Sequence, residues 1–525
     1  MSFNILKKSP VFIWIFAIEI FLFAFIITGF LPRETALVLA VILVIYVLTT
    51  SLENAVILFV ISIPLFLALP ITKTFDNFNT WRIMSAIIFL KWIWPKIFNL
   101  KISIFKFKNP DFKLPLLLLL FFSILSIIPA TDKILAIKRI IYFANLSLIG
   151  FVIFDLARNK YFSNRLIKNI SVPVVTVVII AVIQVISTYF IDIYQFMRIW
   201  GEGIQCRQFG NEWCTIVVEL GNTWFAYYGE QLSLRVFSLF PDSHSFPQFI
   251  LLGLPAIFAL ALSKFKIVDF ENLKKMFRTR TRLIIIFAPL IFLTTILSGT
   301  RGIWAGSIGV LFFIPIVLIK LRRKNAAKGR KNLFKYLVTY MILFFMLFSV
   351  AYPIFVSPQF LLSKGNFNLF GSRIRSIIDF GETSNSQRIE IWKQSFISIK
   401  NKPFFGVGIG NFPLILKQDL FLARAGSSAH NLYLHIAAEM GIPALMAGIW
   451  FLIFLLNKIF SNFLKEKDQI SIVYNGGLLL TVPWILIYSL TDVAIFDERA
   501  FLFLVIAIGL ILAPSPIKLT GDTEN

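Results

Sequence analysis

The sequence predicts an all-α polytopic integral membrane protein, with one membrane domain over residues 1–525. Of its 525 residues, 58% are hydrophobic and only 15% are charged, whereas soluble proteins carry about 25% charged residues. Apolar runs of about 20 residues, the length that crosses a bilayer as a helix, recur from one end of the chain to the other. These observations exclude a soluble globular enzyme, a disordered chain and a fibrous repeat.

The apolar segments predict about 14 transmembrane helices, with a range of about 12–14 because several segments are short or polar. The first segment follows Lys7 and Lys8 and has no small-residue cleavage site after it. We therefore expect it to be retained as a span and not removed as a signal peptide. The predicted spans are 11–30, 35–50, 54–71, 81–98, 114–130, 139–156, 170–190, 246–263, 283–298, 302–319, 336–356, 431–457, 471–490 and 499–513.

Basic residues between the spans predict the orientation. Segment 320–335 holds eight Lys and Arg and no acid, and segment 264–282 holds seven. Both fall in the cytoplasm when both termini are placed there, as the positive-inside rule requires. The net charge of +24 is then explained by loops that face an anionic membrane surface, and no nucleic acid partner is expected. Two long outer loops remain, 191–245 and 357–430, the second of which is expected to carry amphipathic helices.

Arg301 lies in a tight turn, Leu297–Gly302, between two predicted spans. Ser298 and Thr300 are expected to cap the following helix. An arginine at a helix N-terminus adds to the positive end of the helix dipole, which is unfavourable unless an anion binds there. The alternative is an interfacial arginine whose side chain extends to the headgroups.

Arg235 and His244 precede the predicted span 246–263 on the same outer side. Arg235 is either a functional cation or an interfacial anchor. His244 is expected to be a solvated or capping residue.

A third outer segment runs from Ser384 to Asn411. Its apolar residues recur at spacings of three and four, which predicts an amphipathic helix that begins at Asn385 or Ser386, ends before Pro403 and carries Arg388 in its first turn. Arg388 is either functional or a solvated surface residue. The glycines at 406, 408 and 410 do not have dinucleotide-binding spacing, so they indicate a close backbone approach to a ligand or to another segment.

His430 is placed where Ser427 or Ser428 would cap the span 431–457. A histidine in a first helical turn favours its neutral form, which accepts a proton; the alternative is a structural histidine. His435 is expected to be structural and Glu439 is a weaker candidate. Asp492 follows the next span, where a carboxylate either orients a histidine or is solvated in a turn.

Several arginines and one histidine, all placed on the outer side, suit a diphosphate and a proton transfer. No Cys/His cluster has metal-ligand spacing, so neither a metal nor another cofactor is expected.

Four motifs resemble the bacterial O-antigen ligase and polymerase superfamily. They are the block 429–434 with 439–445, Arg388 with Ile391–Trp392 and the stretch 403–412, the turn 298–302, and Arg235 before Pro241–Ser243. The resemblance implies a GT-C-like membrane glycosyltransferase of the bacterial inner membrane that works without a metal. It would take a glycan from undecaprenyl diphosphate at the outer face and pass it, with inversion, to a hydroxyl of another glycan, lipid A core or protein.

The resemblance also implies residue roles. Arg235 and Arg301 would hold the diphosphate, and His430 would be the general base or position the acceptor. Arg388, Asn431 and Asp492 would contribute to substrate binding. The ligase-like assignment has three alternatives: an O-antigen or exopolysaccharide polymerase of the same superfamily, a flippase for lipid-linked glycans, and a scaffold for a polysaccharide synthesis complex.

The chain's two cysteines, Cys206 and Cys214, lie in the first outer loop. If that loop is periplasmic, they share an oxidising compartment. The sequence leaves open whether they form a disulfide or remain two free thiols.

Overall fold

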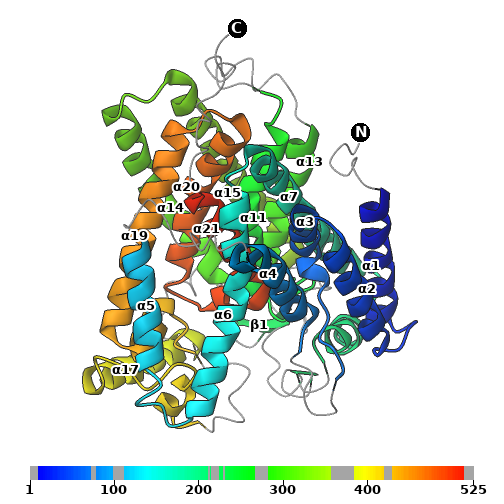
Figure 1. Ribbon diagram of the computed structural model, residues 1–525. Coiled ribbons are helices and arrows are strands. Elements are labelled where there is room, and N and C mark those ends of the chain that lie inside the picture. The colour runs from blue at the N-terminus through cyan, green and yellow to red at the C-terminus, as the bar shows by residue number, and fades with distance from the viewer. Residues whose placement is uncertain are drawn as a thin grey trace.

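A computed structural model describes residues 10–71, 78–98, 112–210, 213–214, 224–228, 231–265, 282–355, 357, 383–418 and 428–513. Helices dominate this part of the chain (Figure 1). A helix lies at each of the predicted span positions. Among the residues described, seven helices are both long and apolar enough to cross a membrane, and five more are apolar but shorter. The chain is therefore built as a polytopic membrane protein, while 14 crossings and a GT-C-like arrangement remain predictions.

The first half of the bundle contains seven α-helices and one short 3-10 helix. They are α1 (Pro10–Thr28), α2 (Thr35–Thr49), α3 (Leu52–Ser62), η1 (Ile63–Leu65), α4 (Thr80–Phe98), α5 (Lys113–Leu125), α6 (Lys133–Leu156) and α7 (Lys160–Ser187). Polar side chains begin several of them: Ser51, Asp132 and Asn159 accept backbone N–H groups at the starts of α3, α6 and α7. Such caps satisfy donors that the first helical turn leaves without a partner.

The second half follows the first outer loop. Its helices are α11 (Ser245–Ala261), α13 (Arg282–Leu297), α14 (Arg301–Arg323), α15 (Lys328–Phe355), α18 (Leu432–Met440), α19 (Ile442–Lys465), α20 (Gln469–Tyr488), η7 (Ala494–Phe496) and α21 (Glu498–Leu512). The single helix predicted for 431–457 is wrong, because the chain breaks between α18 and α19 at Gly441. Gly441 has φ +89°, and a Cβ there would lie 2.1 Å from the carbonyl oxygen of Phe404. The backbone at Phe404, from the second outer loop, thus passes so close to residue 441 that only a glycine fits there.

The two outer loops contain structure of their own. Loop 191–245 holds α8 (Ile193–Phe196), the π-helix η3 (Met197–Gln205), α9 (Cys206–Phe209) and the antiparallel strands β1 (Phe225–Tyr228) and β2 (Gln231–Leu234), in which Phe225 pairs with Leu234. This hairpin departs from the all-α prediction. Of loop 357–430 the structure describes 357, 383–418 and 428–430, with α17 (Thr383–Asn401) and the 3-10 helix η5 (Phe412–Leu416).

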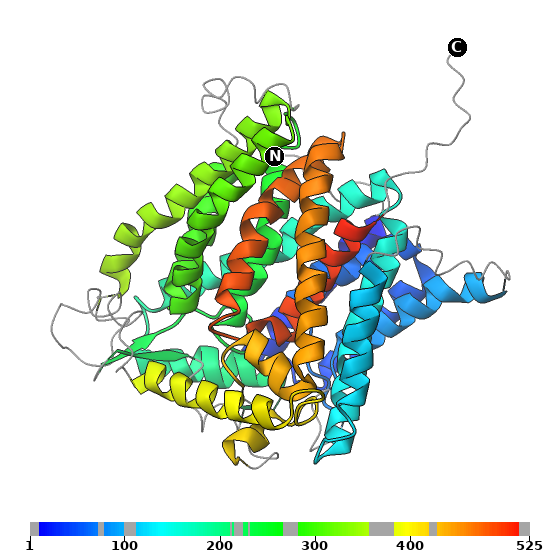
Figure 2. The ribbon, with the colours of Figure 1, turned by 90° about the vertical axis from the view of Figure 1, so that its left-hand side faces the viewer.

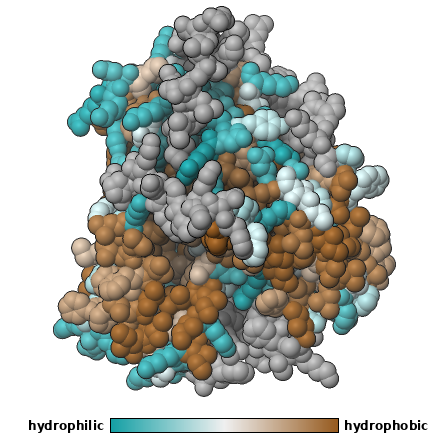
Figure 3. All heavy atoms as spheres, in the orientation of Figure 1, coloured by the Kyte–Doolittle hydropathy of each residue, from teal (hydrophilic) through white to brown (hydrophobic). Residues whose placement is uncertain are grey.

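α17 and the turn between α14 and α15 lie at opposite ends of the bundle (Figures 1 and 2). That turn carries the basic segment 320–335, whereas most of the basic segment 264–282 lies outside the described residues. Hydrophobic side chains form a belt across the face shown in Figure 3, with hydrophilic residues above and below it. This distribution fits a molecule embedded in a bilayer.

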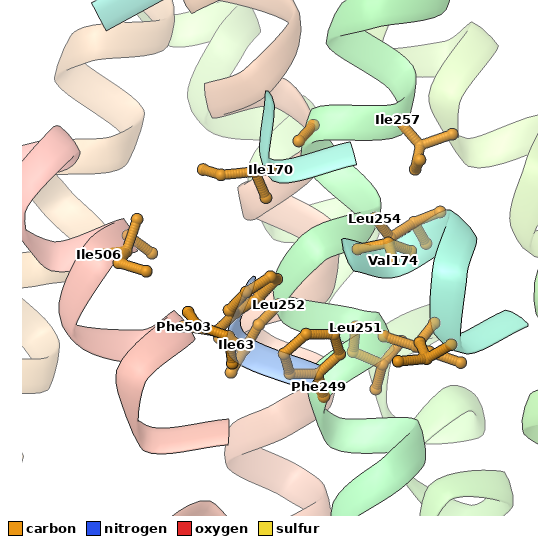
Figure 4. Packing of buried hydrophobic residues seen from close by; sticks show 14 of the residues in the cluster. Ile63, Ile170, Val174, Phe249, Leu251, Leu252, Leu254, Ile257, Phe503 and Ile506 are labelled. Atoms are coloured by element: carbon orange, nitrogen blue, oxygen red, sulfur yellow. The ribbon is translucent and has the colours of Figure 1, made fainter. Parts of the chain in front are cut away.

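Two helices form the centre of the core. α11 is buried along nearly its whole length against α7, α20 and α21, and α20 is almost as enclosed. Phe249 of α11 lies 3.9 Å, ring centre to ring centre, from Phe503 of α21 (Figure 4). Gly253 permits the close approach of α7, because a Cβ there would lie 2.2 Å from Val174. The start of α11 and the end of α20 are consequently held rigidly, and they meet at the site described next.

Candidate functional site

The segment that carries Arg235 is fixed by backbone hydrogen bonds on both sides. The amide of Arg235 donates to the carbonyl of Trp224 (2.8 Å), and the amide of Val236 donates to the carbonyl of Leu297 (3.1 Å). Arg235 follows β2 directly, and Leu297 is the last residue of α13. The hairpin and α13 therefore determine where the Arg235 side chain begins.

His244 is placed by the turn that starts α11. Oδ1 of Asp242 accepts the amides of His244 and Ser245, each at 2.7 Å, which caps the buried helix. Nε2 of His244 lies 2.9 Å from Nη1 of Arg235. Its Nδ1 lies 2.9 Å from Oδ2 of Asp492. The expectation of a solvated or capping His244 is therefore wrong: the ring bridges an arginine and a carboxylate.

The contacts of His244 determine where its ring proton lies. A guanidinium only donates hydrogen bonds, so Nε2 accepts from Arg235 and the proton sits on Nδ1. Nδ1 then donates to Asp492. Arg235 also donates through Nη1 to Oγ of Ser243 (3.2 Å). Arg235, His244 and Asp492 thus form a continuous hydrogen-bonded chain.

Asp492 is the carboxylate at the centre of the site and is only 8% exposed. Burial by itself would raise its pKa, but the interaction with His244, and next that with His430, outweighs burial and holds the pKa of Asp492 well below its ordinary value. Asp492 is therefore ionised at neutral pH. Its position favours the orienting role over a solvated turn.

His430 faces the same carboxylate oxygen from the second outer loop. Its Nδ1 lies 4.0 Å from Oδ2 of Asp492 and makes no hydrogen bond to the described residues. Its φ of +45° is a left-handed conformation, which costs energy in a residue with a Cβ and often marks a functional position. The chain's three histidines thus include two that share Asp492.

Three contacts hold the His430 segment in place. Nε1 of Trp392 in α17 donates to the carbonyl of Ala429 (2.9 Å), and the amide of Leu432 donates to the carbonyl of Ser489 (2.8 Å). The cap of α18 is Asn431, whose Oδ1 accepts from the amides of Tyr433 and Leu434. The predicted Ser427 or Ser428 cap is therefore wrong, and His430 precedes the helix and does not lie in its first turn.

Arg301 begins α14 beside the end of α20. A Cβ on the next residue, Gly302, would lie 2.1 Å from Oγ1 of Thr491 and 2.9 Å from the ring of Tyr488. The glycine thus lets the start of α14 contact the segment that carries Asp492. The predicted Thr300 cap is wrong, because the Thr300 side chain makes no capping hydrogen bond to α14. Its hydroxyl instead donates to the carbonyl of Ser243 (2.9 Å) and joins this turn to the His244 turn.

Arg388 of α17 lies close enough to the site to interact electrostatically with Tyr488. α17 begins at Thr383 and not at Asn385 or Ser386, so Arg388 falls in the second turn. Arg388 and Arg235 both interact electrostatically with Tyr488, whose hydroxyl oxygen is 3.4 Å from Nδ1 of His244. Tyr488 had no distinguishing signal in the sequence. The structure thus places Arg235, Arg301 and Arg388 around the two histidines and Asp492.

His435 and Glu439 form a separate buried pair in α18. Nε2 of His435 lies 3.5 Å from Oε2 of Glu439, and Oε1 accepts from the amide of Phe412 (3.2 Å). Gly406 has φ +64°, and a Cβ there would lie 2.4 Å from the carbonyl oxygen of Ala438. The glycine-rich segment therefore approaches α18 closely, and the pair anchors it, as expected of a structural His435.

Cys206 and Cys214 form a disulfide, with their Cα atoms 5.0 Å apart. The bond closes a small loop beside the π-helix in the first outer loop. Structural disulfides are typical of oxidising compartments, which agrees with an outer location for this loop.

A comparison with protein-family models matches residues 286–449 to the family described as O-antigen ligase. This segment is similar to the O-antigen ligase family. The superfamily resemblance seen in the sequence is thereby confirmed. No curated protein matches the chain. The matched region includes Arg301, Arg388 and His430, while Arg235, which follows β2, and Asp492, which follows α20, lie outside it.

Proposed function

We propose that this O-antigen ligase-domain protein is a glycosyltransferase. In this proposal it transfers a glycan from undecaprenyl diphosphate to a hydroxyl acceptor at the outer face of the bacterial inner membrane. The observation that carries the proposal is the convergence of Arg235, Arg301, Arg388, His430 and Asp492 at the end of the bundle opposite the basic 320–335 turn. The ligase domain supports the reaction class.

The cationic groups suit a diphosphate. Arginine binds phosphate oxygens with two donors at once, and the helices α11 and α14 both begin at the site, so their dipoles add positive potential. In the proposed complex Arg301 and Arg388 hold the diphosphate, and Arg235 adds charge while it orients His244. These charges stabilise the diphosphate as it leaves.

His430 suits the role of general base. Its Nδ1 faces Asp492, so in the neutral ring the proton sits on Nδ1 and Nε2 accepts the acceptor's hydroxyl proton. The hydroxyl oxygen then bonds to the anomeric carbon while the bond to the diphosphate oxygen breaks, and its electron pair leaves with the diphosphate. One such displacement inverts the anomeric centre. The ionised Asp492 stabilises the imidazolium that forms.

The test is the glycan profile of a deletion strain, resolved by length and by lipid carrier. Accumulation of long polymer on undecaprenyl diphosphate indicates a ligase or other terminal transferase, and accumulation of single repeat units indicates a polymerase. Complementation with His430→Ala should fail, while the control Lys393→Ala, on the exposed side of α17, should complement fully. An unchanged profile, together with full complementation by His430→Ala, would refute the proposal and favour a flippase or scaffold.

A further inference from the structure

Two arginines outside the site described above converge on one aromatic ring. The Cζ atom of Arg82, in α4, lies 5.4 Å from the centre of the Tyr142 ring, and that of Arg139, in α6, lies 5.3 Å from the same centre. Arg82 also stacks on Trp81 at 5.3 Å, and Arg139 on Phe143 at 5.1 Å. Stacking on aromatic faces fixes the guanidinium planes and leaves their N–H edges for another partner.

The nearby acids are already satisfied by other groups. Both carboxylate oxygens of Glu498 accept from the Asn79 amide, at 3.2 and 3.0 Å, and one also accepts from Nε1 of Trp81 at 2.8 Å. Asp497 caps α21 through the amides of Arg499 and Ala500. Glu498 also lies 4.0 Å from a guanidinium nitrogen of Arg499. The carboxylates beside the two arginines thus already have donors from other residues.

Within the described ranges, neither Arg82 nor Arg139 has a side-chain hydrogen bond or an ion pair. Nε of Arg82 is buried without an acceptor. A buried donor without a partner is destabilising, and more so when it is charged, so such a group calls for an explanation. An anionic ligand would supply the missing acceptor.

This arginine pair lies close to the His430 segment. His435 interacts electrostatically with both Arg139 and His430. A Cβ on Gly410, in the glycine-rich outer segment, would lie 3.6 Å from Cβ of Arg139. Arg139 therefore lies beside α18, the helix that follows His430.

We propose that Arg82 and Arg139 form a second oxyanion site, which binds a phosphate group carried by the acceptor. The assignment to the acceptor rests on the proposed function; the binding of a phosphate does not. A phosphate offers several acceptor oxygens to two guanidinium edges. Held there, it would orient the acceptor toward the base. A phospholipid headgroup carries the same chemistry, and the test separates the two sources.

The first experiment measures binding of glucosamine 1-phosphate, with glucosamine as the uncharged control, to the full-length protein in phosphatidylcholine nanodiscs by calorimetry. We expect Arg82→Ala and Arg139→Gln each to weaken phosphate-dependent binding at least tenfold, while Arg301→Ala retains a binding event of wild-type affinity. The matched control is Arg158→Ala, because Arg158 also stacks on an aromatic ring, Phe154, but is paired with Asp155 at 3.5 Å. Thermal melts verify that each variant is folded.

Wild-type affinity in both arginine variants would overturn the proposal. In a second arm, nanodiscs contain phosphatidylglycerol, and native mass spectrometry counts retained lipid. If phosphatidylglycerol blocks the probe and only Arg82→Ala and Arg139→Gln lose bound lipid, the site belongs to the bilayer and the acceptor assignment is refuted. Since both readouts are binding, they remain informative even if no glycan transfer is ever observed.

Discussion

Asp492→Asn tests the proposed mechanism most directly, because this carboxylate faces both His244 and His430. The substitution keeps the side chain's shape and removes its charge. At 4.0 Å from Nδ1 of His430, a carboxylate stabilises an imidazolium by about 4 kcal/mol at an effective dielectric of about 20, and by about 1 kcal/mol in water. The His430 side chain is 36% exposed, so we expect a loss of about 1–3 kcal/mol of transition-state stabilisation, or an about 5- to 150-fold lower kcat.

The assay follows transfer from the native lipid-linked donor by purified protein in nanodiscs, with kcat and donor KM determined separately. The loss should appear in kcat, because the imidazolium forms only during the reaction. The matched control is Asp468→Asn, which caps α20 at its other end and should leave kcat unchanged. A kcat within twofold of wild type in folded Asp492→Asn protein would refute the role assigned to the carboxylate.

Asp492 also predicts a pH dependence of stability. Burial opposes ionisation of Asp492, but the interaction with His244 outweighs burial and lowers the folded-state pKa of Asp492. The charge of Asp492 therefore stabilises the fold at pH values above about 3.9, the ordinary carboxyl pKa. That contribution is lost as the pH falls through the lowered folded-state value. The melting temperature of Asp492→Asn should therefore lie below wild type at neutral pH and converge with it in acid.

Three further outcomes follow from the same contacts. Gly302→Ala should lower transfer activity at least tenfold, because its Cβ would lie 2.1 Å from Oγ1 of Thr491, whereas Gly448→Ala, with no atom within 4 Å of its Cβ, should be silent. Trp392→Phe removes the hydrogen bond to the His430 segment and, at about 1 kcal/mol, should lower activity about fivefold; unchanged activity would show that the bond does not position His430. Asp497→Asn keeps a capping oxygen but removes a carboxylate whose pKa burial raises to about 7, against the opposing effect of Arg499. The wild type thus loses stability as the pH rises from about 4 to 7, so the variant's advantage in melting temperature should be largest above pH 7, and a pH-independent difference would contradict this account.

The residues of the candidate site differed in how much their local sequence revealed. Arg301 and His430 stood out because a charge or an imidazole beside an apolar helix is costly unless it has a use. His244 was undervalued, because a single loop histidine carries no sign of its partners, and its partner Asp492 is far away in the sequence. Tyr488 had no signal at all, since a tyrosine at the end of an apolar helix is common at a membrane interface.

Capping residues were the least predictable detail. Serines and threonines near helix starts predicted caps at Ser428 and Thr300, yet Asn431 caps α18 and Thr300 bonds to the carbonyl of Ser243. Several side chains near a helix start have the required chemistry, and the path of the chain decides which one reaches the helix. The break at Gly441 has the same origin, because it depends on a segment that crosses there from an outer loop.

The sequence by itself determined the membrane class, the positions of the apolar helices and the family of the 286–449 segment, because hydrophobic length and local motifs are properties of contiguous residues. Only the tertiary structure decided which polar groups meet. Arg235 follows β2, His244 precedes α11, His430 comes from the second outer loop and Asp492 follows α20. His244 and Asp492 meet because the core packs α11 against α20, and Arg235 and His430 join them there. Hydrogen bonds and charge pairs between such distant segments depend on distances of a few ångströms, which no local pattern of residues encodes.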